Sequence, residues 1–589
     1  MLSGAYSSIG DAAVSAGSRL KALRILGVIA FLLTVGFLLH LPSELGASLA
    51  IPPDSNEYAL GLANLFEHGK FGFTLNGEWY PSRYAPWFSL TCLTPAYFLF
   101  GGDVLSLQWA TLAFALLFLV LSCRIGRMAG LGRWSYLCPI IPMFIPDFVF
   151  YSRLVMTEIP YTAIFALSAI VFVKFAEDES PSFKFCLGAG ALVAWCGAVR
   201  ASALPMLLPF AAAAILKKHE WKRKLLTAAL LAVPSGIYLI ANAAYNKCTF
   251  GSFFRNGYHF WTSVPSDFFD LTFNFGYAAE NACEYLREPV TLIALSLSTV
   301  IAVVSLLVLR GRFGGIARNK GFLLLSTYVL FQGIVLFTLY IGYYWCDVRF
   351  FLPVMLCAIP LFLAAIATVC GSRKRLAASL MLAVALACMA DFRLVTPRYS
   401  FMAHYPIRIA EAGISRAAVP SGAVVIQECN PLFMDYFGYV DKKIEHLPIF
   451  RTFDYTNAMI APTSIAEQDE KPLNWRHRII NGLVSSGVCR LPFPVVLSES
   501  ADCVRRHLEN GRRVFLHFGI GSFGRGMDPD TIFKRLDDAG LRAVEFGAWS
   551  VPYIAPNPVR GLYDSFIFPA FRMDMRPEVQ CIYYEILPK

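Results

Sequence analysis

Two segments between apolar runs carry acidic side chains that could do chemistry. The first reads Pro52-Pro53-Asp54-Ser55-Asn56-Glu57-Tyr58, and the second places Glu158 at the start of another apolar run. A carboxylate near a reacting hydroxyl can take its proton or orient it. A purely structural role is also open. Asp54 and Glu57 have the spacing of a helix-capping box, and Glu158 suits the first turn of a helix or a pair with Arg153.

Single arginines stand in the same set of segments. They are Arg83, Arg200 and Arg349, and none of them lies in a cluster of basic residues. Such side chains either reach toward lipid phosphates or hold an anionic substrate through charge-assisted hydrogen bonds. Acids and arginines gathered around one cavity suit a reaction between a sugar and a lipid-borne phosphate. We therefore take Asp54 and Glu158 as candidate catalytic residues, and Arg349, Arg200 and Arg83 as candidate phosphate-binding residues.

The elements that must position these side chains are membrane helices. The chain has 589 residues, of which 56% are hydrophobic and 16% charged, with a mean hydropathy of +0.53. This composition predicts a membrane protein, and the chain has about eleven apolar segments that could each span a bilayer with roughly 20 residues. Between the spans, the recurrence of Tyr58, Leu62, Leu65 and Phe66 predicts a surface helix that Gly69 ends. The spans are predicted near 23–41, 104–123, 135–150, 160–175, 184–199, 203–216, 225–245, 290–309, 321–341, 350–369 and 376–392.

Basic clusters predict how the spans are oriented. They begin near Arg19, Arg124, Lys217, Arg310 and Arg373, and counting spans from a cytoplasmic N-terminus puts every cluster on the cytoplasmic side. The segments with the candidate site residues then face outward, as do residues 393–589. The net charge of +10 is explained by these clusters, so we expect no nucleic-acid partner. The predicted location is the bacterial inner membrane.

Two domains are expected. Residues 1–392 form the membrane domain, and residues 393–589 form a soluble α/β domain outside the cytoplasm, with strands at Ala423–Gln427, Arg513–Phe518 and Gln580–Leu587. Pro529 and Gly540 mark the ends of a helix in this domain. The cysteines and histidines show no metal-binding spacing. We expect no metal site and no required cofactor, with a divalent cation left open.

Several short motifs resemble the GT-C membrane glycosyltransferases in their order along the chain. They occur over about residues 20–370, and the most similar group is the protein-mannosyltransferase and aminoarabinose-transferase superfamily. The motifs are Asp54 with Tyr58, Ala63 and Gly69; Arg83-Tyr84-Ala85-Pro86 with Phe100-Gly101; Met156-Thr157-Glu158-Ile159-Pro160; Arg200; and Arg349-Phe350-Phe351-Leu352-Pro353.

The resemblance implies a polytopic helical enzyme that uses a polyprenyl-phosphate-linked sugar and inverts the anomeric carbon. Asp54 matches the catalytic acid of the first outer loop, Glu158 matches the acid of the second, and Arg349 matches an arginine that contacts the lipid phosphate. Many relatives have Asp-Glu where this chain has Asp54-Ser55, so the displaced Glu57 is a candidate for substrate positioning. Tyr58, Lys70 and Arg153 are further candidates for that role.

The expected partners are the donor lipid, membrane lipids and an envelope acceptor, which is a lipid, a glycan or a protein. Two other functions remain open. A transporter or flippase of lipid-linked sugars would carry ionisable residues near the membrane midplane, whereas here charge gathers in the segments between spans. A receptor or assembly protein would use the C-terminal domain as its working part.

Overall fold

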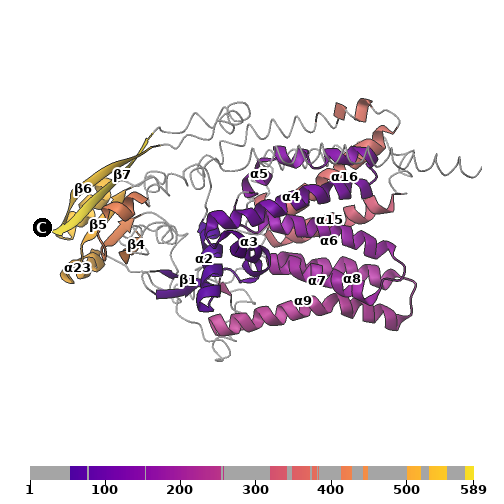
Figure 1. Cartoon of the computed structure of the whole chain (residues 1–589), viewed down its shortest axis with the longest axis horizontal. Helices are drawn as coiled ribbons and strands as arrows, with labels where there is room; N and C mark the ends of the chain where they lie inside the picture. The colour runs from indigo at the N-terminus through magenta and orange to yellow at the C-terminus, as the bar shows by residue number, and fades with distance from the viewer. Residues whose placement is uncertain are drawn as a thin grey trace, which may run out of the picture.

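The structure is a computed structural model, and it describes fourteen stretches of the chain. These are residues 53–75, 78–152, 154–253, 256–257, 319–340, 348–371, 375–377, 379–380, 383, 413–427, 442–448, 501–518, 529–552 and 578–589. The predicted spans at 23–41 and 290–309 lie outside these stretches, as does most of 376–392. Figure 1 shows a helical bundle and a separate β-sheet.

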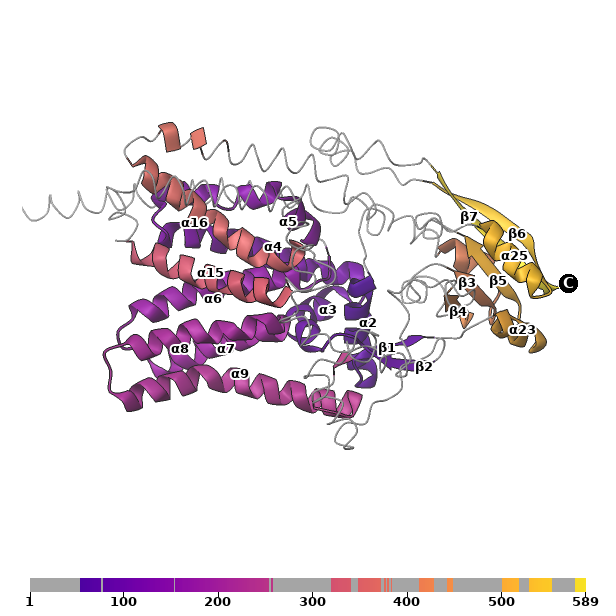
Figure 2. The same cartoon turned by 180° about the vertical axis from the view of Figure 1, so that it is seen from behind.

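The bundle is built around α6 (Glu158–Glu177), which is buried over most of its length. Helices α4 (Val104–Met128), α7 (Phe183–Val199), α15 (Lys320–Tyr340) and α16 (Leu352–Cys370) pack against it (Figure 2). Helix α9 (Trp221–Phe250) packs on α7 and exposes Ile237 and Ile240. Among the described residues, α4, α6, α9, α15 and α16 are long and apolar enough to cross a membrane. Exposed isoleucines on such a helix suit contact with lipid.

Two predicted spans differ from the structure. In place of one helix at 135–150, the chain forms two 3-10 turns, η2 (Gly132–Leu137) and η3 (Ile141–Phe144), followed by the short helix α5 (Pro146–Tyr151). Pro139, Pro142 and Pro146 cause the break, because proline lacks the backbone N–H that a continuous helix needs. The predicted span at 203–216 is a 3-10 turn, η4 (Ala201–Met206), and the short helix α8 (Leu207–Leu216).

The segment before α4 contains the helix predicted around Tyr58 and Phe66. Helix α2 (Pro53–His68) ends at Gly69, whose φ of 69° allows the left-handed turn. A hairpin of β1 (Gly72–Leu75) and β2 (Glu78–Pro81) follows. The π-turn η1 (Ser89–Leu93) and helix α3 (Thr94–Phe100) then lead into α4, and neither was predicted.

The bundle has a basic end, where α6 terminates. Lys217 donates to the carbonyl oxygen of Phe175 at 2.7 Å, which ties the end of α8 to the end of α6. Met128, Glu177 and Lys320 line one cavity, so the end of α4 and the start of α15 lie there as well. Lys217 and Lys320, from two of the predicted clusters, therefore lie at one end of the bundle, and Glu158 lies at the other.

The C-terminal part contains a five-stranded sheet in the order β4-β3-β5-β7-β6. Strand β3 runs parallel to β4 and β5, and β7 runs antiparallel to β5 and β6. The elements are β3 (Val424–Gln427), β4 (Glu445–Pro448), α23 (Ala501–Glu509), β5 (Val514–Phe518), α25 (Pro529–Asp538), β6 (Leu541–Pro552) and β7 (Glu578–Pro588). The three predicted strands are confirmed, and so is a helix that starts at Pro529 and is followed by Gly540 at φ 70°. The domain boundary at 392/393 lies outside the described residues.

Candidate active site

Glu57 is a buried carboxylate that holds Arg83. Its side chain is 2% exposed and accepts hydrogen bonds from Arg83 Nε at 3.0 Å and from Arg83 Nη2 at 2.9 Å. The second carboxylate oxygen accepts from Ser82 Oγ at 2.8 Å and from the backbone N–H of Arg83 at 2.5 Å. Both oxygens thus point to residues 82–83 and away from the start of α2, where a capping box would direct them. Glu57 fixes the backbone and the guanidinium of Arg83 together.

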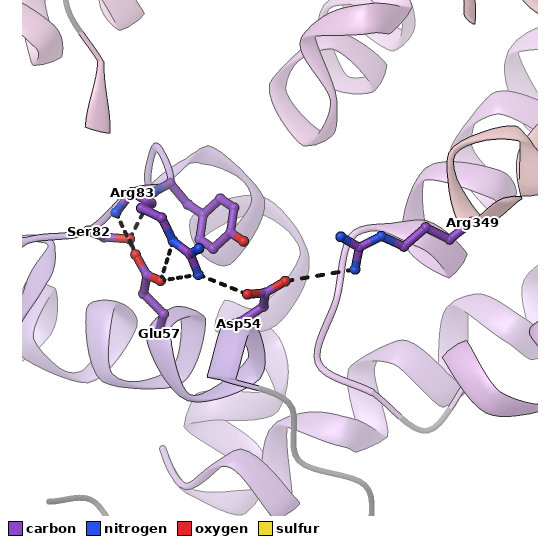
Figure 3. Close-up of polar contacts among 6 residues, drawn as sticks. Asp54, Glu57, Ser82, Arg83 and Arg349 are labelled. Carbon is purple, nitrogen blue, oxygen red and sulfur yellow. Dashed lines mark hydrogen bonds and ion pairs between the residues drawn. The ribbon is translucent and has the colours of Figure 1, made fainter. Parts of the chain in front are cut away.

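Asp54 lies between two arginines, as Figure 3 shows. Its Oδ1 accepts from Arg83 Nη2 at 2.9 Å, and its Oδ2 lies 3.9 Å from Arg349 Nη1. Helix α2 begins at Pro53, which places Asp54 inside the first turn, where a carboxylate is favoured by the helix dipole. The side chain is 20% exposed, so it is the most accessible of the three site acids.

Glu158 and Arg200 form a second pair. Glu158 is the first residue of α6 and is almost fully buried, and its Oε1 accepts from Arg200 Nη2 at 3.0 Å. Arg200 lies at the break between α7 and η4, where its backbone is extended and its N–H donates to Cys196. Among the described residues, Glu158 Oε2 has no hydrogen-bond partner although it is buried. A buried carboxylate oxygen in that state is costly.

Arg349 joins the two pairs. It lies in the 3-10 turn η5 (Val348–Phe351) just before α16, and its Nε is 3.8 Å from Glu158 Oε1. The Cζ atoms of Arg349 and Arg200 lie 5.2 and 5.1 Å from the ring centroid of Phe350, within the range of a cation–π contact. The six charged side chains therefore form one alternating row, in the order Glu57, Arg83, Asp54, Arg349, Glu158 and Arg200.

The remaining predicted site residues lie elsewhere. Tyr58 is buried and stacks on Tyr84, with the two ring centroids 4.4 Å apart. The Cζ atom of Arg83 lies 5.1 Å from the ring centroid of Tyr84. Tyr58 thus supports the segment that carries Arg83. Lys70 follows the far end of α2, with its ammonium 5.4 Å from the ring centroid of Trp79, and it belongs to no described ion pair of the row. Arg153 lies outside the described residues.

Several residues near the row were not proposed as site residues from the sequence. Ser82 and Phe350 are next to the candidate residues Arg83 and Arg349 in the chain. This adjacency was the signal in the sequence that could have identified them. Gly257 was not singled out either, and it packs against the backbone carbonyls of Ser82 and Arg83. Gln332 is a polar residue within an apolar span, which is itself a signal of function.

A divalent cation was left open by the sequence. Within the described residues, no group of three or more His, Cys, Asp or Glu side chains is arranged to hold a metal ion. Each of the three site acids accepts a hydrogen bond from an arginine through one of its carboxylate oxygens.

No family model matches the chain, and no curated protein matches it. The structure is similar to that of ArnT from Cupriavidus metallidurans bound to undecaprenyl phosphate, with 12% identity, a TM-score of 0.49, and coverage of 95% of this chain and 98% of that one. It is also similar to the oligosaccharyltransferase AglB from Archaeoglobus fulgidus, in complex with an inhibitory peptide and a dolichol-phosphate. That match has 10% identity and a TM-score of 0.45, and it covers 72% of this chain and 65% of AglB.

Proposed function

We propose that the chain is an inverting glycosyltransferase that moves a sugar from a polyprenyl-phosphate donor to an envelope acceptor on the outer face of the inner membrane. The observation that carries the proposal is the meeting of Asp54 and Glu158 at Arg349, with Arg200 beside them. A base for an acceptor and a cationic group for a phosphate then lie within reach of one another. The two acids come from α2 and α6, so the site depends on the folded bundle.

The arginines serve the leaving group in this proposal. When the bond between the anomeric carbon and the phosphate oxygen breaks, a phosphodiester becomes a phosphomonoester and gains a negative charge. Arg349 and Arg200 stabilise that charge, because fixed guanidinium groups in a partly buried site do not have to reorganise during the reaction. Their side chains are 27% and 12% exposed, so solvent screens them only in part.

Asp54 serves the acceptor. It takes the proton of an acceptor hydroxyl as the oxygen attacks the anomeric carbon, and it later releases that proton to solvent. If the acceptor nucleophile is a phosphate, no proton needs to be removed, and Asp54 only orients the group. Arg83 was a candidate for the donor phosphate. Its contacts with Glu57 and Asp54 favour a different role, in which it sets the direction of the Asp54 carboxylate.

The distribution of charge supports an outward-facing site. Lys217 and Lys320 lie at the end of the bundle where α6 terminates, and Glu158 lies where α6 begins. Lysine and arginine are enriched on the cytoplasmic side of membrane proteins. The end with the alternating row is then the outer end, where a lipid-linked donor and an envelope acceptor would meet.

The test is a transfer assay with purified protein in liposomes. Radiolabelled polyprenyl-phosphate sugars are added with envelope extract, and label is followed into the acceptor fraction. We expect Asp54→Asn to abolish transfer and Asp178→Asn, an exposed acid at the opposite end of α6, to leave it unchanged. Normal transfer by Asp54→Asn would overturn the assignment of the base. Movement of the donor lipid across the bilayer with no label transfer would instead favour the flippase.

A further inference from the structure

Gln332 is a polar side chain buried within a helix that is otherwise suited to lipid. Helix α15 is apolar over 320–339, yet Gln332 is fully buried inside the bundle. A buried amide in a membrane helix costs free energy unless it makes hydrogen bonds, so such a residue is a candidate for function. The proposed mechanism assigns no role to Gln332.

The amide group of Gln332 binds two other elements. Its Nε2 donates to the hydroxyl of Tyr161 at 2.7 Å and to the backbone carbonyl of Ser202 at 3.2 Å. Tyr161 lies one helical turn after Glu158 on α6. Ser202 lies two residues after Arg200, in η4. One amide nitrogen thus links the two elements that carry the Glu158–Arg200 pair.

This link matters because η4 is a short 3-10 turn that begins at a break in the helix. Arg200 stands at a break in the helix with φ −146° and ψ 114°, and the 3-10 turn that follows contains Pro205. Short 3-10 turns have poor hydrogen-bond geometry and tolerate shifts. The bond from Gln332 to Ser202 holds the backbone next to Arg200 at a set distance from α6, and therefore from Glu158.

We propose that Gln332 is a positioning residue for Arg200, and that through Arg200 it sets the site for the anionic part of the donor. The inference about the donor rests on the proposed function. The inference about the position of Arg200 does not, because it concerns a hydrogen bond and an ion pair of the free protein. Gln332 Oε1 and Ser202 Oγ, both buried, have no hydrogen-bond partner among the described residues. The amide is therefore held by its nitrogen alone.

The chain offers a closely matched control. Tyr328, one turn from Gln332 on α15, shares a hydrogen bond of 2.5 Å with Ser168 on α6. This bond also joins α6 to α15 and is also buried. Ser168, however, lies two turns further along α6 from Glu158 than Tyr161 does, and η4 takes no part in the bond. Tyr328→Phe removes a buried bond between the same two helices without touching Arg200. Gln332→Met removes the amide with little change in volume.

The experiment measures the position of Arg200 and the kinetics separately. Modification of Arg200 by phenylglyoxal is followed by mass spectrometry of the full chain in liposomes, with the exposed Arg127 as internal reference. We expect Gln332→Met to raise the rate of Arg200 modification several-fold and Tyr328→Phe to leave it unchanged. In the transfer assay we expect Gln332→Met to raise the donor KM about tenfold, equivalent to about 1.4 kcal/mol, with a smaller change in kcat.

Equal effects of Gln332→Met and Tyr328→Phe on Arg200 modification would overturn the proposal, because Gln332 would then act only in helix packing. If Gln332→Met does not fold, Tyr161→Phe is used, which removes the hydrogen bond from Gln332 to α6. It should also raise the rate of Arg200 modification several-fold, and an unchanged rate would overturn the proposal. Absence of transfer by the wild-type chain would reject the proposed function and leave the modification result standing.

Discussion

The contact between Glu57 and Arg83 gives the most specific prediction about the site. The perturbation is Glu57→Gln, which keeps the size of the side chain and removes its charge. The single carbonyl oxygen of glutamine can keep the bonds from Ser82 Oγ and the Arg83 backbone. Its amide N–H groups would then face Arg83 Nε and Nη2, which are also donors, so both side-chain bonds to the guanidinium are lost.

The expected cost follows from these two bonds. A buried hydrogen bond to a charged group contributes about 1.5–3 kcal/mol. The Arg83 side chain is 31% exposed, so the lower part of that range applies to each bond. We expect Glu57→Gln to lower the free energy of unfolding by about 3–4 kcal/mol. Turnover should fall about 10- to 100-fold, because Arg83 then no longer holds Asp54 in one direction.

A double-mutant cycle checks this reasoning. The free energy of unfolding is measured in mixed detergent micelles for Glu57→Gln, Arg83→Met and the double variant. Arg83→Met alone leaves a buried carboxylate uncompensated and should cost about 3–5 kcal/mol. The double variant should cost less than the sum by about 1.5–3 kcal/mol, since a neutral residue 57 needs no cation. Additivity within about 0.5 kcal/mol, or a raised acceptor KM at unchanged stability, would show that Glu57 acts on the substrate and not on Arg83.

Three further predictions concern other parts of the chain. Arg349→Lys keeps the charge between the two site carboxylates but loses the planar fork, so the donor KM should rise about tenfold in the transfer assay. Gly257→Ala places a Cβ against the backbone carbonyl of Arg83, so it should lower the free energy of unfolding by about 1–3 kcal/mol and reduce turnover. Gly236→Ala is the control and should do neither, because its added Cβ would have no atom within 4 Å. In α23, beside the five-stranded sheet, burial lowers the pKa of His507 below its ordinary value of 6.5. The unfolded chain therefore binds more protons, and the stability of β5 in hydrogen exchange should fall as the pH drops from about 6.5 through the lowered pKa, a dependence that His507→Gln removes.

Span lengths and strand positions were predictable because each depends on local composition. Helices α6 and α15 are apolar runs of sufficient length, and β5 is a short buried run, so neither case requires knowledge of distant contacts. The predicted span at 135–150 was wrong. The mean composition of this region is that of a span, but its three prolines lack the N–H groups on which a continuous helix depends. The elements η1 and α3 were missed because they are short apolar helices, which composition does not distinguish from a loop packed on the bundle.

The sequence indicated candidate residues for a site, but not the pairs that these residues form. Charge in an apolar chain is conspicuous, so Asp54, Glu158 and the isolated arginines stood out. Which acid meets which arginine depends on the packing of α2, α6 and η5, and no local pattern carries that information. Glu57 illustrates the limit. Its spacing from Asp54 matches a capping box, and only the fold shows that its two oxygens are taken by Ser82 and Arg83.

The alternating row has a weakest point, and that point is where the proposed donor would enter. The bonds of Arg83 and Arg200 to their acids measure 2.9–3.0 Å, whereas Arg349 lies 3.8 and 3.9 Å from Glu158 and Asp54. A phosphate bound at Arg349 neutralises it and divides the row. On one side of Arg349, the Glu158–Arg200 pair carries no net charge. On the other side, Glu57, Arg83 and Asp54 together carry one negative charge. In the proposed reaction this part contains the base, so the proton taken from the acceptor by Asp54 restores neutrality there as the phosphate charge grows beside Arg349.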